Sequence, residues 1–279
     1  MALIRYPGSK EKLSNRIWSL FPDEMRHELW MEARAHEYRE PFFGAGAMGF
    51  RILAILPKRC RVWINDIDPG MHALWSAVAN HHRELIRHAM RFTPSTDYFY
   101  QFKEEDGRLT GCMVRDGFRK LALHRMSYSG LGVMSGGPLG GRNQKSEYNV
   151  ACRWSAERIS KDITKLHSIF RRFRDLRITC GDFSPLIHDD SGESFIYADP
   201  PYYEKGGQLY KHNMNHEDHE RLALLLRETK AKWVLSYDDH PAIRLLYSWA
   251  TFHEIHVKYT MAKAKGVRPK NREVAITPS

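Results

Sequence analysis

Short apolar runs that end at acidic or glycine-rich turns recur along the chain, and this pattern predicts the buried strands of an α/β protein. Residues 195–198 form one such run and end at Asp199. Residues 61–65 form a second and end at Asp66. Because open α/β sheets carry their chemistry outside the carboxyl ends of parallel strands, both acids are predicted to lie at a functional edge.

A third strand, predicted around residues 38–43, leads into Gly44, Gly46 and Gly49, which have the spacing G-x-G-x-x-G. The apolar segment that follows, up to Ile55, has the character of a helix. Glycines at these places permit a tight turn, and the helix start offers free N–H groups to a nucleotide-like ligand. An acid about 20 positions further on is expected to bind ribose, and Asp66 fits. This motif alone leaves NAD possible.

The tetrapeptide Asp199-Pro200-Pro201-Tyr202 is predicted to be a catalytic loop. Consecutive prolines restrict the backbone, so that one carboxylate and one aromatic ring keep a fixed direction. That pair suits a flat, aminated substrate. An ordinary turn is the alternative, because Asp-Pro dipeptides also open turns.

Two further patterns complete the predicted sheet. Residues 232–236 form an apolar strand, and residues 252–261 with 273–277 form a closing hairpin, which makes one strand antiparallel. Asn215 is expected to cap a helix that starts with solvated residues. His212, His216 and His219 lie near this start, but no metal site is predicted from them.

Composition adds a polyanionic partner to this picture. The 279 residues include 43 Lys and Arg against 33 Asp and Glu, for a formal charge of +10. Such a charge favours nucleic acid. An apolar content of 42% supports one sizeable α/β core. We find no membrane-spanning run or signal peptide, so a cytoplasmic, nucleoid-associated protein is expected.

The chain resembles the Dam-type (D12 class) DNA adenine-N6 methyltransferases, which carry a DPPY loop after a PFxGxG turn. Here these motifs are residues 199–202 and 41–46, in the alpha-group order. The resemblance implies a Rossmann-like class I methyltransferase fold, with a seven-stranded, mostly parallel sheet and helices on both faces. It also implies a small, mainly helical target-recognition lobe at residues 85–151, inserted between two parts of the catalytic domain, residues 1–84 and 152–279.

By the same resemblance, the enzyme transfers a methyl group from S-adenosyl-L-methionine to a flipped adenine in double-stranded DNA and releases S-adenosyl-L-homocysteine. Hydrogen bonds to the acid and to the first proline carbonyl of the DPPY loop would polarise the adenine amine, and the tyrosine would stack on the base. The catalytic residues implied are Asp199, Pro200, Pro201 and Tyr202. The cofactor-binding residues implied are Tyr6, Gly8, Lys10, Glu40, Pro41, Phe42, Gly44, Gly46, Asp66, Ile67, Asp182, Phe183 and Asp199.

The insert departs from the family pattern. His124 and Ser129 stand where the family has asparagines, and Ala151 stands where it has proline. The spacer formed by residues 132–141 contains five glycines in place of an Arg-x-Asn element. We therefore predict no GATC specificity and hypothesise relaxed sequence specificity. The candidate DNA contacts are Arg125, Arg142, Lys145 and Asn149.

Several alternatives stay open at this point. Cytosine-N4 methylation uses the same geometry, although serine is usual where Asp199 stands. Single-stranded DNA or RNA would also present an accessible base. A catalytically silent nucleic-acid-binding module would retain the fold, and an NAD-dependent oxidoreductase would leave the DPPY loop unexplained. Adenine-N6 methylation of DNA is the predicted function. The sequence does not reveal the oligomeric state, for which a monomer is the default.

Overall fold

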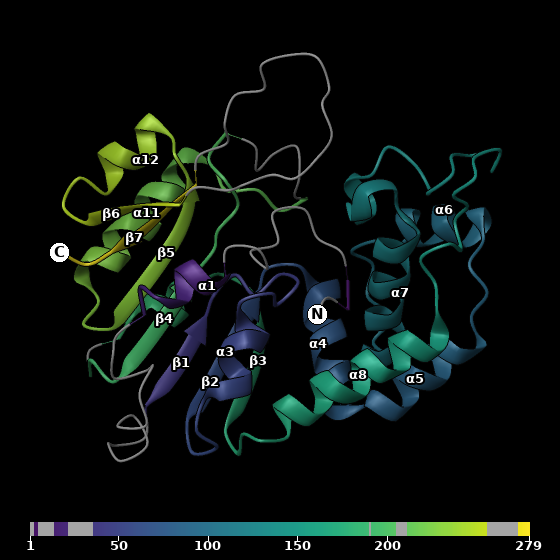
Figure 1. Cartoon of the computed structure of the whole chain (residues 1–279), viewed down its shortest axis with the longest axis horizontal. Helices are drawn as coiled ribbons and strands as arrows, with labels where there is room; N and C mark the ends of the chain where they lie inside the picture. The colour runs from purple at the N-terminus through teal and green to yellow at the C-terminus, as the bar shows by residue number, and fades with distance from the viewer. Residues whose placement is uncertain (1–2, 5–13, 22–35, 190, 205–210, 256–272) are drawn as a thin grey trace.

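The computed structural model describes residues 3–4, 14–21, 36–189, 191–204, 211–255 and 273–279. Within them, one seven-stranded sheet has the order β3-β2-β1-β4-β5-β7-β6 (Figure 1). The strands are β1 (Glu37–Glu40), β2 (Arg61–Asp66), β3 (Leu176–Cys180), β4 (Ser194–Ala198), β5 (Lys232–Asp238), β6 (Thr251–Ile255) and β7 (Glu273–Thr277).

Strands β1 to β5 run parallel to their neighbours, and β7 runs antiparallel to both β5 and β6. The prediction of seven strands with one antiparallel is therefore confirmed. Residues 256–261, the second half of one predicted hairpin strand, lie outside the described residues. The sequence analysis did not place β3, although Leu176 and Ile178 alternate with polar residues in the manner of a strand.

Alternation along the strands builds a hydrophobic core on each face of the sheet. In β4, Phe195 and Tyr197 belong to one core, and Ile196 and Ala198 belong to the other. Every residue of β4 is buried, as expected for a central parallel strand with helices on both faces. The predicted doubly covered Rossmann-like sheet is confirmed.

The helices are α1 (Ser14–Trp18), α3 (Gly49–Ile55), α4 (Pro69–Asn80), α5 (His82–Arg91), α6 (Thr96–Glu104), α7 (Met113–Met126), α8 (Ala156–Phe170), α9 (Ser184–Ile187), α11 (His216–Glu228) and α12 (Pro241–Leu246). Two short 3-10 helices, η3 (Tyr128–Gly130) and η4 (Gly132–Met134), follow α7. The core of Phe195 includes side chains of α1, α3, α4, α5, α7 and α8, and the core of Ile196 includes side chains of α9, α11 and α12.

Helices α5, α6 and α7 fall largely within residues 85–151, the predicted insert, and lie to one side of the sheet (Figure 1). Helix α7 packs along α4, and Gly117 makes the close approach possible, because a Cβ there would lie 2.7 Å from Leu74 Cα. Phe99 and Phe118 share one core with Val62 and Ile64 of the sheet. The helical character expected for the insert is confirmed, and its hydrophobic core is continuous with that of the sheet.

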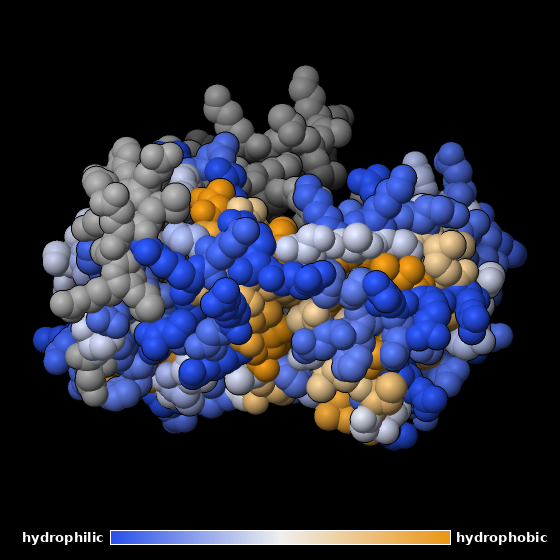
Figure 2. All heavy atoms as spheres, turned by 90° about the horizontal axis from the view of Figure 1, so that it is seen from below, coloured by the Kyte–Doolittle hydropathy of each residue, from blue (hydrophilic) through white to orange (hydrophobic). Residues whose placement is uncertain are grey.

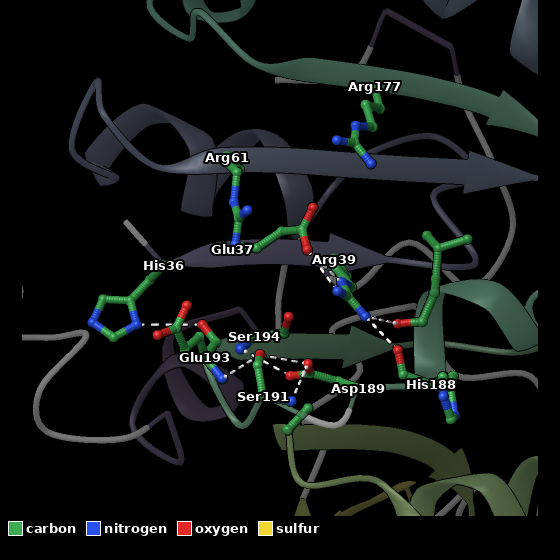
Figure 3. Close-up of polar contacts among 12 residues, drawn as sticks. His36, Glu37, Arg39, Arg61, Arg177, His188, Asp189, Ser191, Glu193 and Ser194 are labelled. Atoms are coloured by element: carbon green, nitrogen blue, oxygen red, sulfur yellow. Dashed lines mark hydrogen bonds and ion pairs between the residues drawn. The ribbon is translucent and has the colours of Figure 1, made fainter. Parts of the chain in front are cut away.

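Polar contacts fix the start of β1 beside the start of β4 (Figure 3). The Arg39 guanidinium donates to Glu37 Oε2 at 2.6 Å and to the His188 carbonyl at 2.7 Å. The Asp189 carboxylate accepts the Ser194 N–H at 3.1 Å. Figure 2 views the molecule from below Figure 1, and hydrophilic residues cover most of that face, with apolar groups between them.

Candidate active site

The strand order places the two principal motifs side by side. Because β1 and β4 are neighbours from which the chain winds in opposite directions, the crevice outside their carboxyl ends is the topological switch point of the sheet. The glycine turn leaves β1 and the Asp-Pro-Pro-Tyr loop leaves β4 at this crevice. Asp66 ends β2, and Asp182 follows β3 by two residues.

Asp199 is half-buried, and a residue of β5 forms a hydrogen bond with its carboxylate. The Ser236 hydroxyl donates to Asp199 Oδ1 at 3.2 Å, and Ser236 Oγ lies 2.8 Å from the Tyr197 hydroxyl. Both Tyr197 and Ser236 are buried. The carboxylate therefore has a fixed direction, which the sequence analysis attributed only to the prolines.

Glu40 lies at the end of β1 with only 2% of its surface exposed. It accepts a hydrogen bond from the Tyr38 hydroxyl at 2.6 Å. Burial, together with the negative charge of Asp199, raises the pKa of Glu40 well above its ordinary value. A Cβ on Gly49 would lie 2.4 Å from Glu40 Oε2, so the last glycine of the motif makes room for this acid. Burial and the nearby carboxylate of Asp199 therefore both disfavour a negative charge on Glu40.

The carboxylate of Asp66 binds the backbone of the glycine turn. Gly44 and Gly46 have φ angles of 49° and 68°, which glycine adopts without strain. The Gly44 N–H donates to Asp66 Oδ2 at 2.8 Å, and the Asp68 N–H donates to Oδ1 at 2.9 Å. Burial and the nearby charge of Asp68 raise the pKa of Asp66 to about 6. Each oxygen keeps a second lone pair for a ligand hydroxyl.

Apolar side chains from two predicted cofactor motifs meet beside this acid. The rings of Phe42 and Phe183 have centroids 5.3 Å apart. The Asn65 side chain donates to the carbonyls of Pro41 and Gly181 at 3.2 and 3.0 Å and so ties the two loops together. The sequence analysis missed Asn65, whose only signal was its place before Asp66. Ile67, with 52% of its surface exposed, offers a further apolar surface after β2.

Asp182 has a partner that sequence reasoning did not find. The guanidinium of Arg221 in α11 donates to both carboxylate oxygens at 2.8 Å. These hydrogen bonds hold the pKa of Asp182 well below its usual range. The guanidinium also lies 4.3 Å from the centroid of the Phe183 ring. A cofactor adenine that uses Asp182 and Phe183 must therefore share both groups with Arg221.

The end of the Asp-Pro-Pro-Tyr loop rests on β5 and α11. Tyr202 and Tyr203 pack against the core that contains Ile196. The Tyr203 N–H donates to Asp238 Oδ1 at 3.2 Å, and the Tyr203 hydroxyl lies 3.1 Å from Nδ1 of His216. These contacts anchor the loop at its carboxyl end.

The predicted capping of α11 by Asn215 is confirmed, since its side chain accepts the Asp218 N–H at 2.8 Å in a capping box. The expectation of a solvated helix start is wrong for His219, which is 1% exposed. His219 Nδ1 lies 2.5 Å from the Tyr237 hydroxyl, and burial lowers the pKa of His219 to about 4. The amphipathic pattern of α11 carries His219 to the core side, next to Leu222.

The candidate DNA contacts divide into two groups. Arg142, Lys145 and Asn149 are exposed, and the Arg142 guanidinium lies over the ring of Tyr100 at 5.9 Å. Arg125 is half-buried, and its guanidinium donates to the carbonyls of Leu3 and Arg153 at 2.9 and 3.2 Å. Arg125 is thus bonded to the backbone of two other segments, and its contact with a DNA phosphate or base stays a prediction.

The glycine-rich spacer is bonded to the end of α7. The Leu139 N–H donates to the Met126 carbonyl at 2.8 Å, and the Tyr128 N–H donates to the Gly137 carbonyl at 3.0 Å. His124, the first departure from the family pattern, lies with Nδ1 2.9 Å from the Gly130 carbonyl. Ser129, the second, has a φ of 58°. The third, Ala151, lies in the turns before α8.

Three predicted cofactor residues, Tyr6, Gly8 and Lys10, lie outside the described residues. So does the basic stretch of residues 263–272. Among the residues that the structure describes, no cluster of His, Cys, Asp or Glu has the arrangement of a metal site, and no helix is long and apolar enough to cross a membrane.

Comparison with known proteins decides the family. The model of the D12 class N6 adenine-specific DNA methyltransferases matches residues 6–261. The chain belongs to this family. It is a DNA methyltransferase that acts on the N6 amine of adenine.

Two relatives of this D12 methyltransferase are similarly distant. "Type II methyltransferase M.MjaIII" of Methanocaldococcus jannaschii is 26% identical over 245 residues, which cover 81% of this chain and 78% of the relative. "Type II methyltransferase M1.LlaDCHI" of Lactococcus lactis subsp. cremoris is 24% identical over 288 residues, covering 98% and 93% of the two chains. Family membership, the Rossmann-like fold and the enzymatic function predicted from the sequence are thus confirmed.

Proposed function

We propose that this D12 methyltransferase uses S-adenosyl-L-methionine to methylate a flipped adenine of double-stranded DNA, with Asp199 as the catalytic carboxylate. The convergence of the β1 and β4 loops at one crevice carries the proposal. It brings the acid of one motif beside the glycine turn of the other. A cofactor and a base bound to these two motifs would meet at that point.

The residues at the carboxyl ends of β1, β2 and β3 suit the adenosine part of the cofactor. Asp66 would accept hydrogen bonds from the ribose hydroxyls, and Phe42, Ile67 and Phe183 offer apolar contact to the adenine ring. Asp182 would bond the adenine amine. The remaining cofactor contacts in this proposal are Tyr6, Gly8, Lys10, Glu40, Pro41, Gly44 and Gly46. When bound, S-adenosylmethionine supplies an electrophilic methyl group on its sulfonium.

The loop after β4 suits a base amine that must be held and polarised. The Asp199 carboxylate and the Pro200 carbonyl would each accept one hydrogen of the amine, which withdraws its lone pair from ring conjugation. Asp199 would supply the negative charge that a nitrogen becoming positive requires, and burial disfavours a second negative charge on the neighbouring Glu40. Pro201 would restrict the loop, and Tyr202 would stack on the flipped base.

The insert, taken as residues 85–151, is proposed to bind the duplex with Arg142, Lys145 and Asn149. All three side chains are exposed in the segment of residues 142–149, where the Arg142 guanidinium lies over the ring of Tyr100. Gly136 and Gly137 present no side chain, and a Cβ on either would contact nothing within 4 Å. Such a surface has few groups with which to read base edges, which supports relaxed sequence specificity.

Separate substitutions test the two halves of the site. Asp199→Asn should lower the methylation rate by about 10²- to 10³-fold, because the positioned charge is lost. It should leave the dissociation constant of S-adenosylhomocysteine, measured by calorimetry, within about twofold. Asp66→Ala should instead weaken that binding. Asp175→Ala, at an exposed position before β3, is the control. An Asp199→Asn enzyme with the wild-type methylation rate would refute the catalytic assignment.

A further inference from the structure

A chain of ion pairs beside the active site joins three parts of the molecule. Lys120 of α7 is 4% exposed, and its Nζ lies 2.5 Å from Asp68 Oδ2 and 3.2 Å from Asp106 Oδ1. The Asp106 side chain is 7% exposed, and its Oδ2 lies 2.8 Å from Lys211 Nζ. Asp106 is thus a buried carboxylate that pairs with a different lysine at each of its two oxygens.

Two glycines leave room for the side chains of Lys120 and Lys211. A Cβ on Gly70 would lie 2.9 Å from Lys120 Cδ, and a Cβ on Gly107 would lie 2.8 Å from Lys211 Nζ. Lys211 also donates to the Asp106 carbonyl at 3.2 Å, so it binds the backbone and the side chain of the same residue. Each lysine therefore has a defined position against the main chain of another segment.

The two ends of this chain of ion pairs are connected to the two halves of the active site. At one end, the Asp68 N–H donates to Asp66, the proposed ribose ligand. At the other end, Lys211 lies four residues before Asn215, the N-cap of α11, and His216 of α11 contacts the Tyr203 hydroxyl after the Asp-Pro-Pro-Tyr loop. That loop is bound at its exit by Asp238, through the Tyr203 N–H. Asp106 itself lies in the insert, just after α6.

We propose that Asp106 and Lys211 are positioning residues for methyl transfer, which hold the segment that leads into α11 at a fixed place on the insert. DNA bound to the insert and the carboxylate of Asp199 are thereby kept in register. The inference rests on the proposed role of Asp199. It extends that role to an ion pair that touches neither the cofactor nor the base.

Lys211 permits a test without unfolding, because its side chain is 35% exposed and the buried carboxylate of Asp106 keeps Lys120 as a partner. Lys211→Met should lower the single-turnover methylation rate about tenfold, since small misplacements of reacting groups are costly. The dissociation constants for duplex DNA and for S-adenosylhomocysteine should stay within about twofold, and the melting temperature within ~2 °C. Lys211→Arg should restore most of the rate, because it keeps the charge.

A second variant and a matched control complete the experiment. Asp106→Asn should show a similar loss, and adding Lys211→Met to it should cause little further loss, because the two residues act through one contact. Lys165→Met removes an exposed lysine of α8 and should behave as wild type. Wild-type rates in Lys211→Met, or fully additive losses in the double variant, would overturn the inference. A wild-type enzyme inactive on all DNA would overturn the proposed function instead.

Discussion

Lys120 is a buried cation whose loss should be measurable as a loss of stability. Its ammonium group contacts the carboxylates of Asp68 and Asp106, and all three side chains are largely shielded from water. Burial opposes both charges, but their mutual attraction outweighs it. The pKa of Asp68 is accordingly lowered and that of Lys120 raised. Both groups are charged at pH 7, so the pair contributes fully in a neutral buffer.

Lys120→Met should lower the free energy of unfolding by about 3 kcal/mol. This value is the low end of the range of about 3–5 kcal/mol that is typical for removing one partner of a buried ion pair. The low end applies because both acids keep partners. Asp68 caps α4 through the N–H groups of Gly70 and Met71, and Asp106 keeps Lys211. For a chain of this size the loss corresponds to roughly 6–12 °C in melting temperature.

Urea unfolding followed by circular dichroism measures this loss, with the exposed Lys165→Met as the matched control. Combining Lys120→Met with Asp68→Asn should recover part of the lost stability, because the double variant leaves one fewer buried charge unpaired. A Lys120→Met protein within about 1 kcal/mol of wild type would refute the reasoning, since the loss of a buried counter-ion would then cost little.

Three further predictions follow from single side chains. Because the pKa of Asp66 is about 6, its carboxyl takes up a proton as the pH falls from 7 to 5. The affinity for S-adenosylhomocysteine, measured by calorimetry, should therefore fall up to about tenfold over this range. An equal fall in Asp66→Asn would show that protonation of Asp66 is not the cause. Ser129→Asn should raise the melting temperature by ~1–3 °C, because asparagine tolerates the positive φ of this position better than serine. A lower melting temperature would contradict the idea that the backbone at residue 129 is strained. Mapping of modified adenines in a methylation-free host that expresses the enzyme should find them in several sequence contexts, and one strict consensus would refute relaxed specificity.

The sequence was sufficient to predict the place in the fold of those candidate residues that end or follow a patterned strand. Asp66, Asp199 and the glycine turn each follow a run whose burial the alternation already indicates. The parallel sheet then brings their carboxyl ends to one edge, so convergence follows from the fold class.

Long-range partners could not be predicted in the same way. Arg221 reaches Asp182 from α11, and Lys120 reaches Asp68 from α7, across many intervening residues. Nothing in local pattern or spacing distinguishes these cations from ordinary surface residues. His219 was misjudged for a related reason, because the buried side of α11 is set by its packing on β5.

The identity of the methylated base is the most direct test of this assignment. The wild-type enzyme would be incubated with S-adenosylmethionine and unmethylated duplex DNA, single-stranded DNA or RNA, and the digested nucleosides would be quantified by mass spectrometry, with Asp199→Ala as the control. N6-methyladenine in duplex DNA, absent from the control reaction, is the expected result. N4-methylcytosine in its place, or no methylated nucleoside from any of the three substrates, would contradict the assignment.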